Sequence, residues 1–242
     1  SEMCIRDRNE GMPIGAFWGY KTDGLIQTQE QLNAVKRADF QPNAELGDVL
    51  FVDTNGDGKL DSSDRCMIGN PIPDIIYGIN MGMAWKGFDL NLQFGGTIGN
   101  QIFNAMRYYT YFPNDITNKD RALMNYWTPN NTNTDIPRLT ATDVNDNDRF
   151  SDMYVENGTY FRLRNAQLGY TLPASLTQRI KLQKVRFYVS GQNLFTISSY
   201  SGMDPEVGQS SSLSRGIDYG IYPQNISFTG GINAVSYTHL TL

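Results

Sequence analysis

The chain has 242 residues, of which 12% are aromatic and 23 are glycine, and its formal net charge is -5. This acidic balance argues against nucleic acid as a partner, because phosphate backbones are bound by basic surfaces. No apolar run is long enough for a transmembrane helix, and no secretory signal stands at the start. If the protein is exported, we expect its true N-terminus to lie outside this chain.

The two ends fit no pattern in the rest of the chain. Residues 1–8 (SEMCIRDR) and 235–242 (VSYTHLTL) resemble translated adapter sequence, so we expect both to be non-native. They contain His239, which is the only histidine, and Cys4, one of the two cysteines. Without them Cys66 stands alone, which excludes a disulfide framework and a histidine-based site. Cys66 is expected to be a packing residue, because no base is present to activate its thiol.

Two strand-like segments precede the first clear motif. Residues 14–22 (IGAFWGYKT) form a weak strand candidate, and residues 47–52 (GDVLFV) are rich in β-branched and aromatic side chains. Such residues favour the pleated, half-buried surface of a sheet. We therefore expect the motif that follows to be flanked by strands.

Residues 53–64, DTNGDGKLDSSD, match a calcium loop at five side-chain positions and at the central glycine, Gly58. Calcium prefers six to eight oxygen ligands, supplied in such loops from positions 1, 3, 5, 7, 9 and 12. The alternative is a plain solvated turn, because N-G and D-G are strong turn signals. The predicted ligands are Asp53, Asn55, Asp57, Lys59 through its backbone carbonyl, Asp61 and Asp64.

The flanks of this loop exclude a helical calcium sensor. An EF-hand needs a long helix on each side, whereas residues 65–78 contain two prolines and two glycines. The position-12 residue is Asp64 rather than glutamate, so we expect modest affinity. We expect calcium here to stiffen a surface loop within a β protein.

A long hairpin is the clearest element. Residues 75–85 alternate apolar side chains with small or polar ones, Lys86-Gly87 makes a tight turn, and residues 88–95 alternate again. Each arm has about 10 residues, the length that crosses a bilayer when tilted. Aromatic side chains at the ends of the arms are typical of interfacial girdles: Tyr77, Trp85, Phe88 and Phe94.

The same alternation recurs in residues 159–171, 184–197 and 225–234. In the first of these segments the apolar side chains change from odd to even positions near Arg164-Asn165. This change predicts a β-bulge or an exit from the membrane zone. These segments, with the hairpin and the candidate over 14–22, predict about six antiparallel strands.

Short and long connections alternate along the chain. Residues 172–183 form a modest turn, whereas 98–150 and 199–224 form long loops. Short helices are expected within the first long loop, near 100–111 and 118–127. Outer-membrane barrels show this asymmetry, with short periplasmic turns and long extracellular loops. The fold class predicted is therefore all-β, as part of a transmembrane antiparallel β-barrel.

A secreted calcium-binding β-sandwich, acting as an adhesion or carbohydrate-binding module, is the alternative, because its strands alternate too. Three features favour the barrel: polar faces of Gly, Asn, Gln and Ser rather than Lys and Glu, aromatic strand ends, and long loops on one side.

The order of motifs resembles the SusC/RagA-type TonB-linked outer-membrane transporters. The resemblance spans about residues 9–234. The segments that carry it are EGMPIGAFWGYKTDGLIQTQEQL (10–32), the calcium-type loop with its hairpin (47–96), DMYVENGTYFRLRNAQLGYTLP (152–173), VRFYVSGQNLFTIS (185–198) and YSGMDPEV (200–207).

This resemblance implies a C-terminal barrel fragment of an outer-membrane protein that imports oligosaccharides, or peptides, with a SusD-like lipoprotein as its lid. Contact with the TonB complex would come from an N-terminal part that this chain lacks, and lipid would surround the barrel. Alone, a fragment of about six strands has unpaired edges and is not expected to close or to transport.

The expected function is passage rather than catalysis, because no nucleophile–base pair is visible in the sequence. Asp143, Asp146 and Asp148 are expected to be solvated loop residues rather than an acid–base set. Aromatic side chains in the first long loop are candidates for stacking on sugar or contacting a partner, and packing within the folded loop is the favoured alternative. These are Tyr108, Tyr109, Tyr111, Tyr126 and Trp127.

Overall fold

The computed structural model describes residues 12–111, 118–207 and 215–236. The chain divides into two compact units, each made of several chain segments. The sheet unit consists of Asp74–Gly99, Thr159–Ser199 and Tyr222–Leu242, and the loop unit consists of Ser1–Pro73, Asn100–Gly158 and Tyr200–Ile221. The predicted leader 1–8 lies outside the described residues, as do residues 237–242 of the predicted tail.

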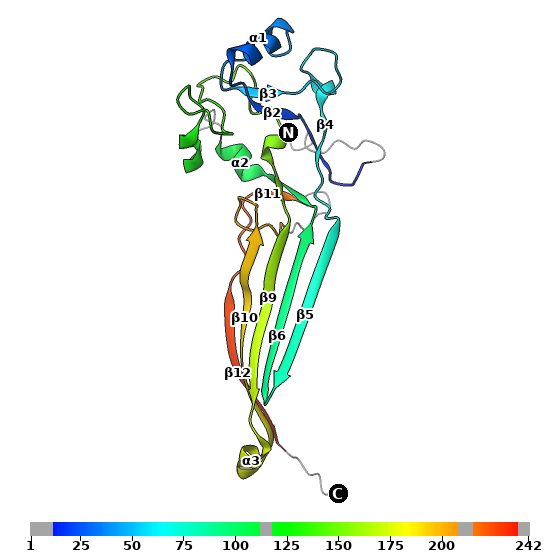
Figure 1. Cartoon of the computed structure of the whole chain (residues 1–242), viewed down its shortest axis with the longest axis vertical. Helices are drawn as coiled ribbons and strands as arrows, with labels where there is room; N and C mark the ends of the chain where they lie inside the picture. Colours follow the sequence, from blue (N-terminus) through cyan, green and yellow to red (C-terminus); the bar gives the residue numbers. More distant parts are fainter. Residues whose placement is uncertain (1–11, 112–117, 208–214, 237–242) are drawn as a thin grey trace. The chain divides into compact units, whose positions relative to one another are not determined.

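Five antiparallel strands make the sheet unit, in the order β12-β10-β9-β6-β5 (Figure 1). Their bounds are β5 Ile75–Trp85, β6 Phe88–Ile98, β9 Tyr160–Thr171, β10 Leu182–Ser198 and β12 Ser227–Ser236. The hairpin and the three later strands are thus confirmed. β12 also includes Val235 and Ser236, the first two residues of the predicted tail.

The hairpin register follows from its two-residue turn. Trp85 pairs with Phe88, so Lys86 and Gly87 alone connect β5 to β6. Both turn residues have positive φ, 47° and 90°, as a type I′ turn requires. This turn suits the right-handed twist of the two strands and holds their apolar side chains on one face.

The change from odd to even positions expected in β9 is confirmed as a bulge. Asn165 pairs with Gln93 and Leu163 with Phe94, so Arg164 is skipped in the register with β6. The extra residue keeps Phe161 and Leu163 on the same face as Ala166 and Leu168, which simple alternation would have prevented.

One face of this sheet is apolar and exposed. Met83, Trp85, Val189 and Ile232 are each at least 60% accessible. Such a face on an ordinary soluble domain would be covered, because burying it removes a large apolar area from water. The exposure of these side chains disfavours the predicted sandwich alternative, in which a second sheet would bury them.

All the long insertions leave the sheet at one end. β5, β9 and β12 begin there, and β6 and β10 finish there, as the alternating strand directions require. At the other end the Lys86-Gly87 turn joins β5 to β6. A short connection there joins β9 to β10 (Figure 1) and contains α3 (Ala174–Thr177) and a 3₁₀ turn, Gln178–Ile180.

The loop unit contains three small sheets. β1 (Phe17–Gly19) pairs with β4 (Cys66–Gly69), and β2 (Thr22–Leu25) pairs with β3 (Val49–Phe51). The third has the order β11-β7-β8, with β7 over Gln101–Asn104, β8 over Val155–Asn157 and β11 over Ile217–Asp218. The expected sixth long strand over 14–22 is therefore wrong. That segment supplies β1 and the start of β2, because glycines interrupt its apolar run.

The helices of the loop unit are short. α1 (Gln29–Arg37) begins with a capping box in which Thr28 and Gln31 satisfy each other's backbone N–H groups. Within the first long loop, α2 covers only Ala105–Thr110, and Arg121–Asn125 forms a 3₁₀ turn. Two further 3₁₀ turns cover Ser62–Asp64 and Asp152–Tyr154. In the described part of the chain, no helix has both the length and the apolar character needed to cross a membrane.

Two apolar clusters form the main core of the loop unit. Phe17, Phe103 and Tyr154 centre the first, and Trp127 packs with Val49 and Phe51 in the second. Gly47 lies directly under the Trp127 ring, where a Cβ would be 2.2 Å from Cε3, and its φ is +86°. The part of the long loop that contains Trp127 is therefore packed into the core of the loop unit.

Candidate functional site

The apolar face of the sheet unit carries an aromatic row near each end. At the end where the long insertions leave, Phe161 lies 5.2 Å from Phe94 and 6.4 Å from Tyr77, measured between ring centroids. At the turn end, Phe88 lies 4.5 Å from Tyr170 and pairs with Trp85.

The spacing between these rows matches a bilayer. Tyr77 and Trp85 are eight residues apart on β5, which is about 26 Å along an extended strand. The apolar band of outer-membrane barrels is about 25 Å tall and lies between two aromatic girdles. On β5 the side chains between the rows on this face are aliphatic: Ile79, Met81 and Met83.

The opposite face of the sheet is polar. It contains amide side chains in neighbouring register, with Asn80 opposite Gln93 and Asn91 opposite Gln167. Near the turn end, Arg186 donates its Nε–H to Asp89 at 2.9 Å. In a closed barrel such a face lines the interior, where polar side chains meet water or protein.

The acidic residues of loop 53–64 bind the loop's own backbone. Asp53 accepts hydrogen bonds from the N–H groups of Gly56 at 2.7 Å and Gly58 at 2.8 Å. The Gly58 bond is the main reason that the pKa of Asp53 is lowered. Asp64 is fully buried and accepts from the N–H groups of Thr54 and Asp61, each at 3.0 Å.

The remaining predicted ligands follow the same pattern. Asn55 accepts from Asp57 N at 2.8 Å, Asp57 from Lys59 N at 2.9 Å, and Asp61 from Ser63 N at 2.7 Å. The side-chain oxygens of this loop have the type and spacing that suit calcium ligands. A carboxylate that accepts one hydrogen bond from an N–H group keeps further lone pairs with which it can bind a metal ion. In the described part of the chain, however, no three acidic, histidine or cysteine side chains converge as a metal site requires.

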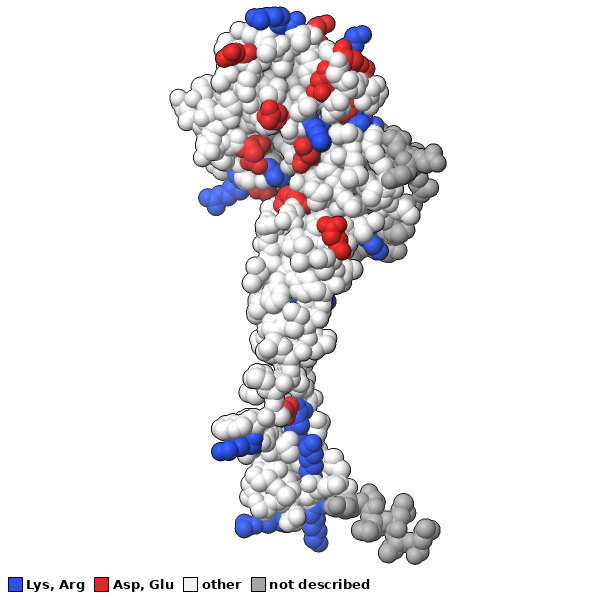
Figure 2. All heavy atoms as spheres, turned by 45° about the vertical axis from the view of Figure 1, so that its right-hand side comes forward, with Lys and Arg blue, Asp and Glu red and all other residues white. Residues whose placement is uncertain are grey.

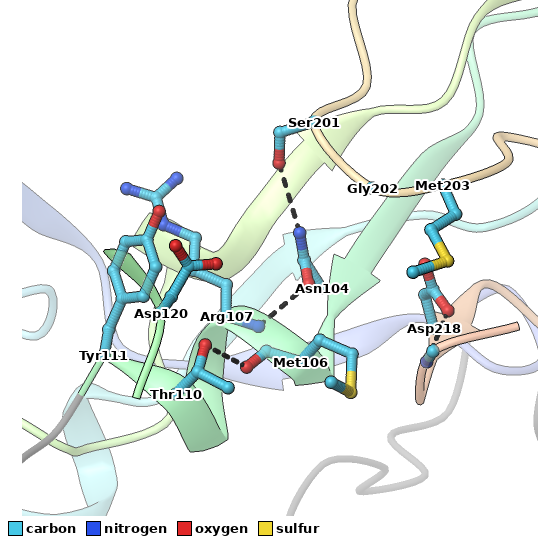
Figure 3. Close-up of a pocket in the computed structure, with 11 residues that line it drawn as sticks. Asn104, Met106, Arg107, Thr110, Tyr111, Asp120, Ser201, Gly202, Met203 and Asp218 are labelled. Carbon is cyan, nitrogen blue, oxygen red and sulfur yellow. Dashed lines mark hydrogen bonds between the residues drawn. The ribbon is translucent and has the colours of Figure 1, made fainter. Parts of the chain in front are cut away.

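A separate cavity of about 360 Å³ lies in the loop unit, between α2 and the segment that follows β10. Figure 3 shows Asn104 at its centre, with Arg107, Tyr111 and Asp120 on one side and Met203 and Asp218 on the other. Asn104 caps α2 through Arg107 N at 2.9 Å and donates to Ser201 Oγ at 3.2 Å.

The charged groups of this cavity are held by protein partners. Arg107 pairs with Asp135 and lies 4.9 Å from the Tyr111 ring, measured from its guanidinium carbon to the ring centroid. Asp218 is buried and accepts a 2.6 Å hydrogen bond from the Tyr200 hydroxyl. The exposed Met106 and Met203 side chains are the adaptable part of the lining, because thioether chains repack easily. This arrangement suits binding of a small group rather than catalysis.

The five predicted aromatic residues separate into different roles. Trp127 is 6% exposed in the core, so stacking on cargo is the wrong prediction for this residue. Tyr108 packs against Phe103 and Tyr154, and burial raises the pKa of its hydroxyl. Tyr109 is 51% exposed. Tyr111 lines the cavity, and burial raises the pKa of its hydroxyl too. Tyr126 is half-buried.

The predicted solvated carboxylates are partly engaged. Asp143 accepts from Asp148 N at 3.1 Å, and Asp146 pairs with Arg149 at 3.0 Å. Desolvation and the charges of Asp143 and Asp146 raise the pKa of Asp148. Cys66 packs against the first core cluster, and burial raises the pKa of its thiol.

Sequence reasoning missed the cavity, because Met106 is about 100 residues away along the chain from Met203 and Asp218. The only available signal was the YSGMDPEV motif, which includes Met203 and was noted for its order alone.

A one-sided apolar sheet with two aromatic rows, a polar opposite face and long insertions at one end defines part of an outer-membrane β-barrel. No family model matches the chain. Among curated proteins, it is 39% identical over 234 residues to TonB-dependent receptor P3 of Formosa agariphila, covering 93% of this chain and 22% of that receptor. It is 29% identical over 195 residues to the TonB-dependent receptor SusC of Bacteroides thetaiotaomicron, covering 80% of this chain and 18% of SusC.

Among solved structures, the RagAB peptide importer in its open-open state matches with a TM-score of 0.68 at 25% identity. That match covers 92% of this chain and 22% of the neighbour. The chain belongs to the SusC/RagA-type TonB-dependent receptors, which are located in the outer membrane. It spans about a fifth of the length of the curated relatives it matches.

Proposed function

We propose that this chain is a barrel segment of a transporter that imports oligosaccharides or peptides across the outer membrane, powered through TonB and assisted by a SusD-like lipoprotein. The supporting observation is the match to TonB-dependent receptors over 93% of the chain, together with likeness to a protein titled a peptide importer. The chain's part in transport is structural: its apolar face meets lipid and its polar face lines the passage.

The transport proposal is tested by deleting the receptor gene in its own host and measuring growth on defined oligosaccharides and on defined peptides. Growth should fail on one class of nutrient and be normal on simple sugars and amino acids. Re-expression of the whole receptor should restore growth, and re-expression in a strain without TonB should not. Unchanged growth and uptake on every large nutrient would contradict the proposal.

The lid proposal has its own test. We expect a surface lipoprotein of the SusD type to copurify with the tagged whole receptor at a stoichiometry near one to one. A receptor that purifies without any such lipoprotein, under conditions that retain the complex of a known pair, would contradict it.

The orientation follows from the long insertions, which outer-membrane barrels place outside the cell. The Lys86-Gly87 turn then faces the periplasm, and the loop unit belongs to the extracellular side. A cysteine at exposed Asp39 should react with a membrane-impermeant maleimide on intact cells, whereas one at Lys86 should react only after lysis.

For loop 53–64 we propose that calcium binding gathers acidic side chains and stiffens the loop. The oxygen-bearing side chains of the loop support this proposal. They already accept hydrogen bonds from the loop backbone, and these bonds fix its turns. Asp53→Asn/Asp57→Asn should remove one calcium per receptor in calorimetry and should increase cleavage of the loop by protease. The charge-matched control, Asp23→Asn/Glu30→Gln, should change neither. Equal calcium stoichiometry in both variants would contradict the role.

For the cavity beside α2 we propose contact with cargo. Its volume of about 360 Å³ is near the lower end of typical ligand pockets. Met203→Trp should fill it and lower uptake, whereas Met124→Trp, on an exposed side chain outside the cavity lining, should leave uptake unchanged. Equal uptake in the two variants would show that the cavity does not contact cargo during transport.

A further inference from the structure

The sheet unit has a charge opposite to that of the chain. The full chain has a net charge of -5, yet the sheet unit contains seven basic residues and only two acidic ones. The two acidic residues are Asp74 and Asp89, and Asp89 is already paired with Arg186. An excess of positive charge on the membrane part of an acidic protein points to a negatively charged neighbour.

The excess is concentrated at the turn end of the sheet. Three exposed cations lie there, on the Lys86-Gly87 turn and on the connection between β9 and β10. In Figure 2 the basic side chains gather at this end, and the strands above them show almost no charge. We call this group the basic rim, and its members are Lys86, Arg179 and Lys181; Lys184 lies within β10 on the polar face, where its charge acts on Asp89.

The basic rim stands beside the lower aromatic row. The Lys86 ammonium lies 4.9 Å from the ring centroid of Trp85, which is 70% exposed on the apolar face. Tryptophan at this depth marks the headgroup region of a bilayer, and long cationic side chains reach into the same region. The rim is therefore at the level of lipid phosphates.

A groove crosses the apolar face above the rim, with a volume of about 390 Å³. Its floor is made by three small residues on neighbouring strands: Ala166, Gly191 and Gly230. Ala166 pairs directly with Gly191, and Gly230 pairs with Val189, two residues before Gly191 on β10. Leu168, Val189 and Phe228 form its walls. The small side chains of the floor leave room between these walls for a rod of methylene groups.

The groove lies within one leaflet of the lower aromatic row. From Phe187, which pairs with Tyr170 of that row, to Gly191 in the groove is four residues along β10, about 13 Å. One leaflet of a bilayer's hydrocarbon core is about 15 Å thick. A barrel grows by adding strands to the edges β5 and β12, so the rest of the receptor leaves this face of β9, β10 and β12 open.

We propose that the basic rim and the groove together bind an anionic phospholipid of the periplasmic leaflet, with its phosphate at the rim and one acyl chain in the groove. The choice of leaflet rests on the orientation given under the proposed function, whereas lipid binding itself does not depend on transport. A zwitterionic lipid fits the groove equally well but gains less from three cations, so the site selects by headgroup charge.

The test uses the purified whole receptor in detergent with equimolar phosphatidylglycerol and phosphatidylcholine of the same acyl chains, with retained lipids counted by native mass spectrometry. The wild type should retain phosphatidylglycerol preferentially. Lys86→Asn/Arg179→Gln/Lys181→Asn should lower that preference by about fivefold or more, because each basic side chain near a membrane surface contributes about this factor. Asn is used at 86 and 181 because Lys86 and Lys181 have φ of 47° and 55°, which Asn tolerates.

Two further variants make the result specific. Lys21→Gln/Lys36→Gln/Arg37→Gln removes the same charge from exposed positions of the loop unit and should leave the preference unchanged. Gly230→Leu occupies the groove, where a Cβ meets only Tyr188 O at 3.8 Å, and should lower the number of retained lipids of both kinds.

Three outcomes would overturn the proposal: no headgroup preference in the wild type, an equal loss in the two triple variants, or a protein or second receptor copy covering the groove in place of lipid. Failure of the nutrient-uptake test would leave this lipid result intact, so the two proposals fail separately.

Discussion

Arg186 reaches across strand β9 to Asp89, passing over Gly169. Asp89 on β6 pairs with Gly169, and Gly169 pairs on its other side with Tyr188 of β10. A Cβ at Gly169 would lie 2.4 Å from the Arg186 Nη2 atom, so the ion pair exists only because that position has no side chain. The pair links three strands on the polar face near the turn end.

Gly169→Val should break this link and destabilise the barrel by about 1.5–3 kcal/mol, the range for hydrogen bonds that involve charged groups. Gly78→Val is the matched control, because a Cβ there meets only Phe94 O at 3.8 Å. Urea unfolding of the whole receptor in lipid vesicles measures both. A Gly78 variant as unstable as the Gly169 variant would mean that strand glycines matter here for reasons other than the ion pair.

The two faces of β5 should respond oppositely to charge. Met81→Lys places a cation near the middle of the apolar band and should cost about 2–4 kcal/mol, lowering the yield of folded receptor in the outer membrane. Asn80→Lys, one residue away on the polar face, should be tolerated. Heat-modifiable gel mobility of membrane fractions reports the folded fraction, and equal yields would contradict the assignment of the faces.

Asp48 and Arg138 join the long loop to the β2–β3 sheet. Asp48 is fully buried and accepts from Arg138 Nε at 2.6 Å, from Asn147 Nδ2 at 3.0 Å and from Glu45 N at 2.8 Å. Removing one member leaves an unpaired buried charge, so Arg138→Met should destabilise the loop unit by about 3–5 kcal/mol.

Hydrogen exchange of loop-unit peptides in the whole receptor should show this loss around residues 45–52 and 136–147. Asp48→Asn/Arg138→Met should recover part of the stability, because the double change removes both charges together. A double variant less stable than Arg138→Met alone would show that Asp48 acts mainly through its other hydrogen bonds.

The loop unit should lose stability in alkali through Tyr200. Burial, and then the hydrogen bond to Asp218, raise the pKa of Tyr200 far above its usual value of 10. The folded state therefore favours the neutral phenol. Its contribution is complete below pH 10 and falls as the pH rises further, because the unfolded chain can ionise and the folded one cannot. Tyr200→Phe should reduce the rise in exchange rates, corrected for intrinsic pH dependence, between pH 9.5 and 11, and the remaining rise belongs to Tyr108, Tyr111 and Tyr154, whose pKa values burial also raises. A wild-type slope retained in that variant would assign the effect to another tyrosine.

The amino-acid sequence by itself determined the sheet unit. Alternation with period 2 depends only on neighbouring residues, so it located the strands in Ile75–Trp85, Phe88–Ile98 and Tyr160–Thr171, the bulge at Arg164 and the aromatic ends. The composition of the polar face, rich in Asn, Gln and Gly, was also sufficient to favour a barrel over a sandwich.

Only the tertiary structure decided the loop unit, because its contacts join residues far apart in the chain. It showed that residues 14–22, predicted as one strand, supply β1 and the start of β2 in two different small sheets, and it placed Trp127 in the core over Gly47. It also brought Met106, Met203 and Asp218 to one cavity, and Ala166, Gly191 and Gly230 to one groove. The alternation of apolar and polar residues shows on which face of a strand a side chain lies. Contacts between segments far apart in the chain depend on tertiary packing, which no local pattern of residues encodes.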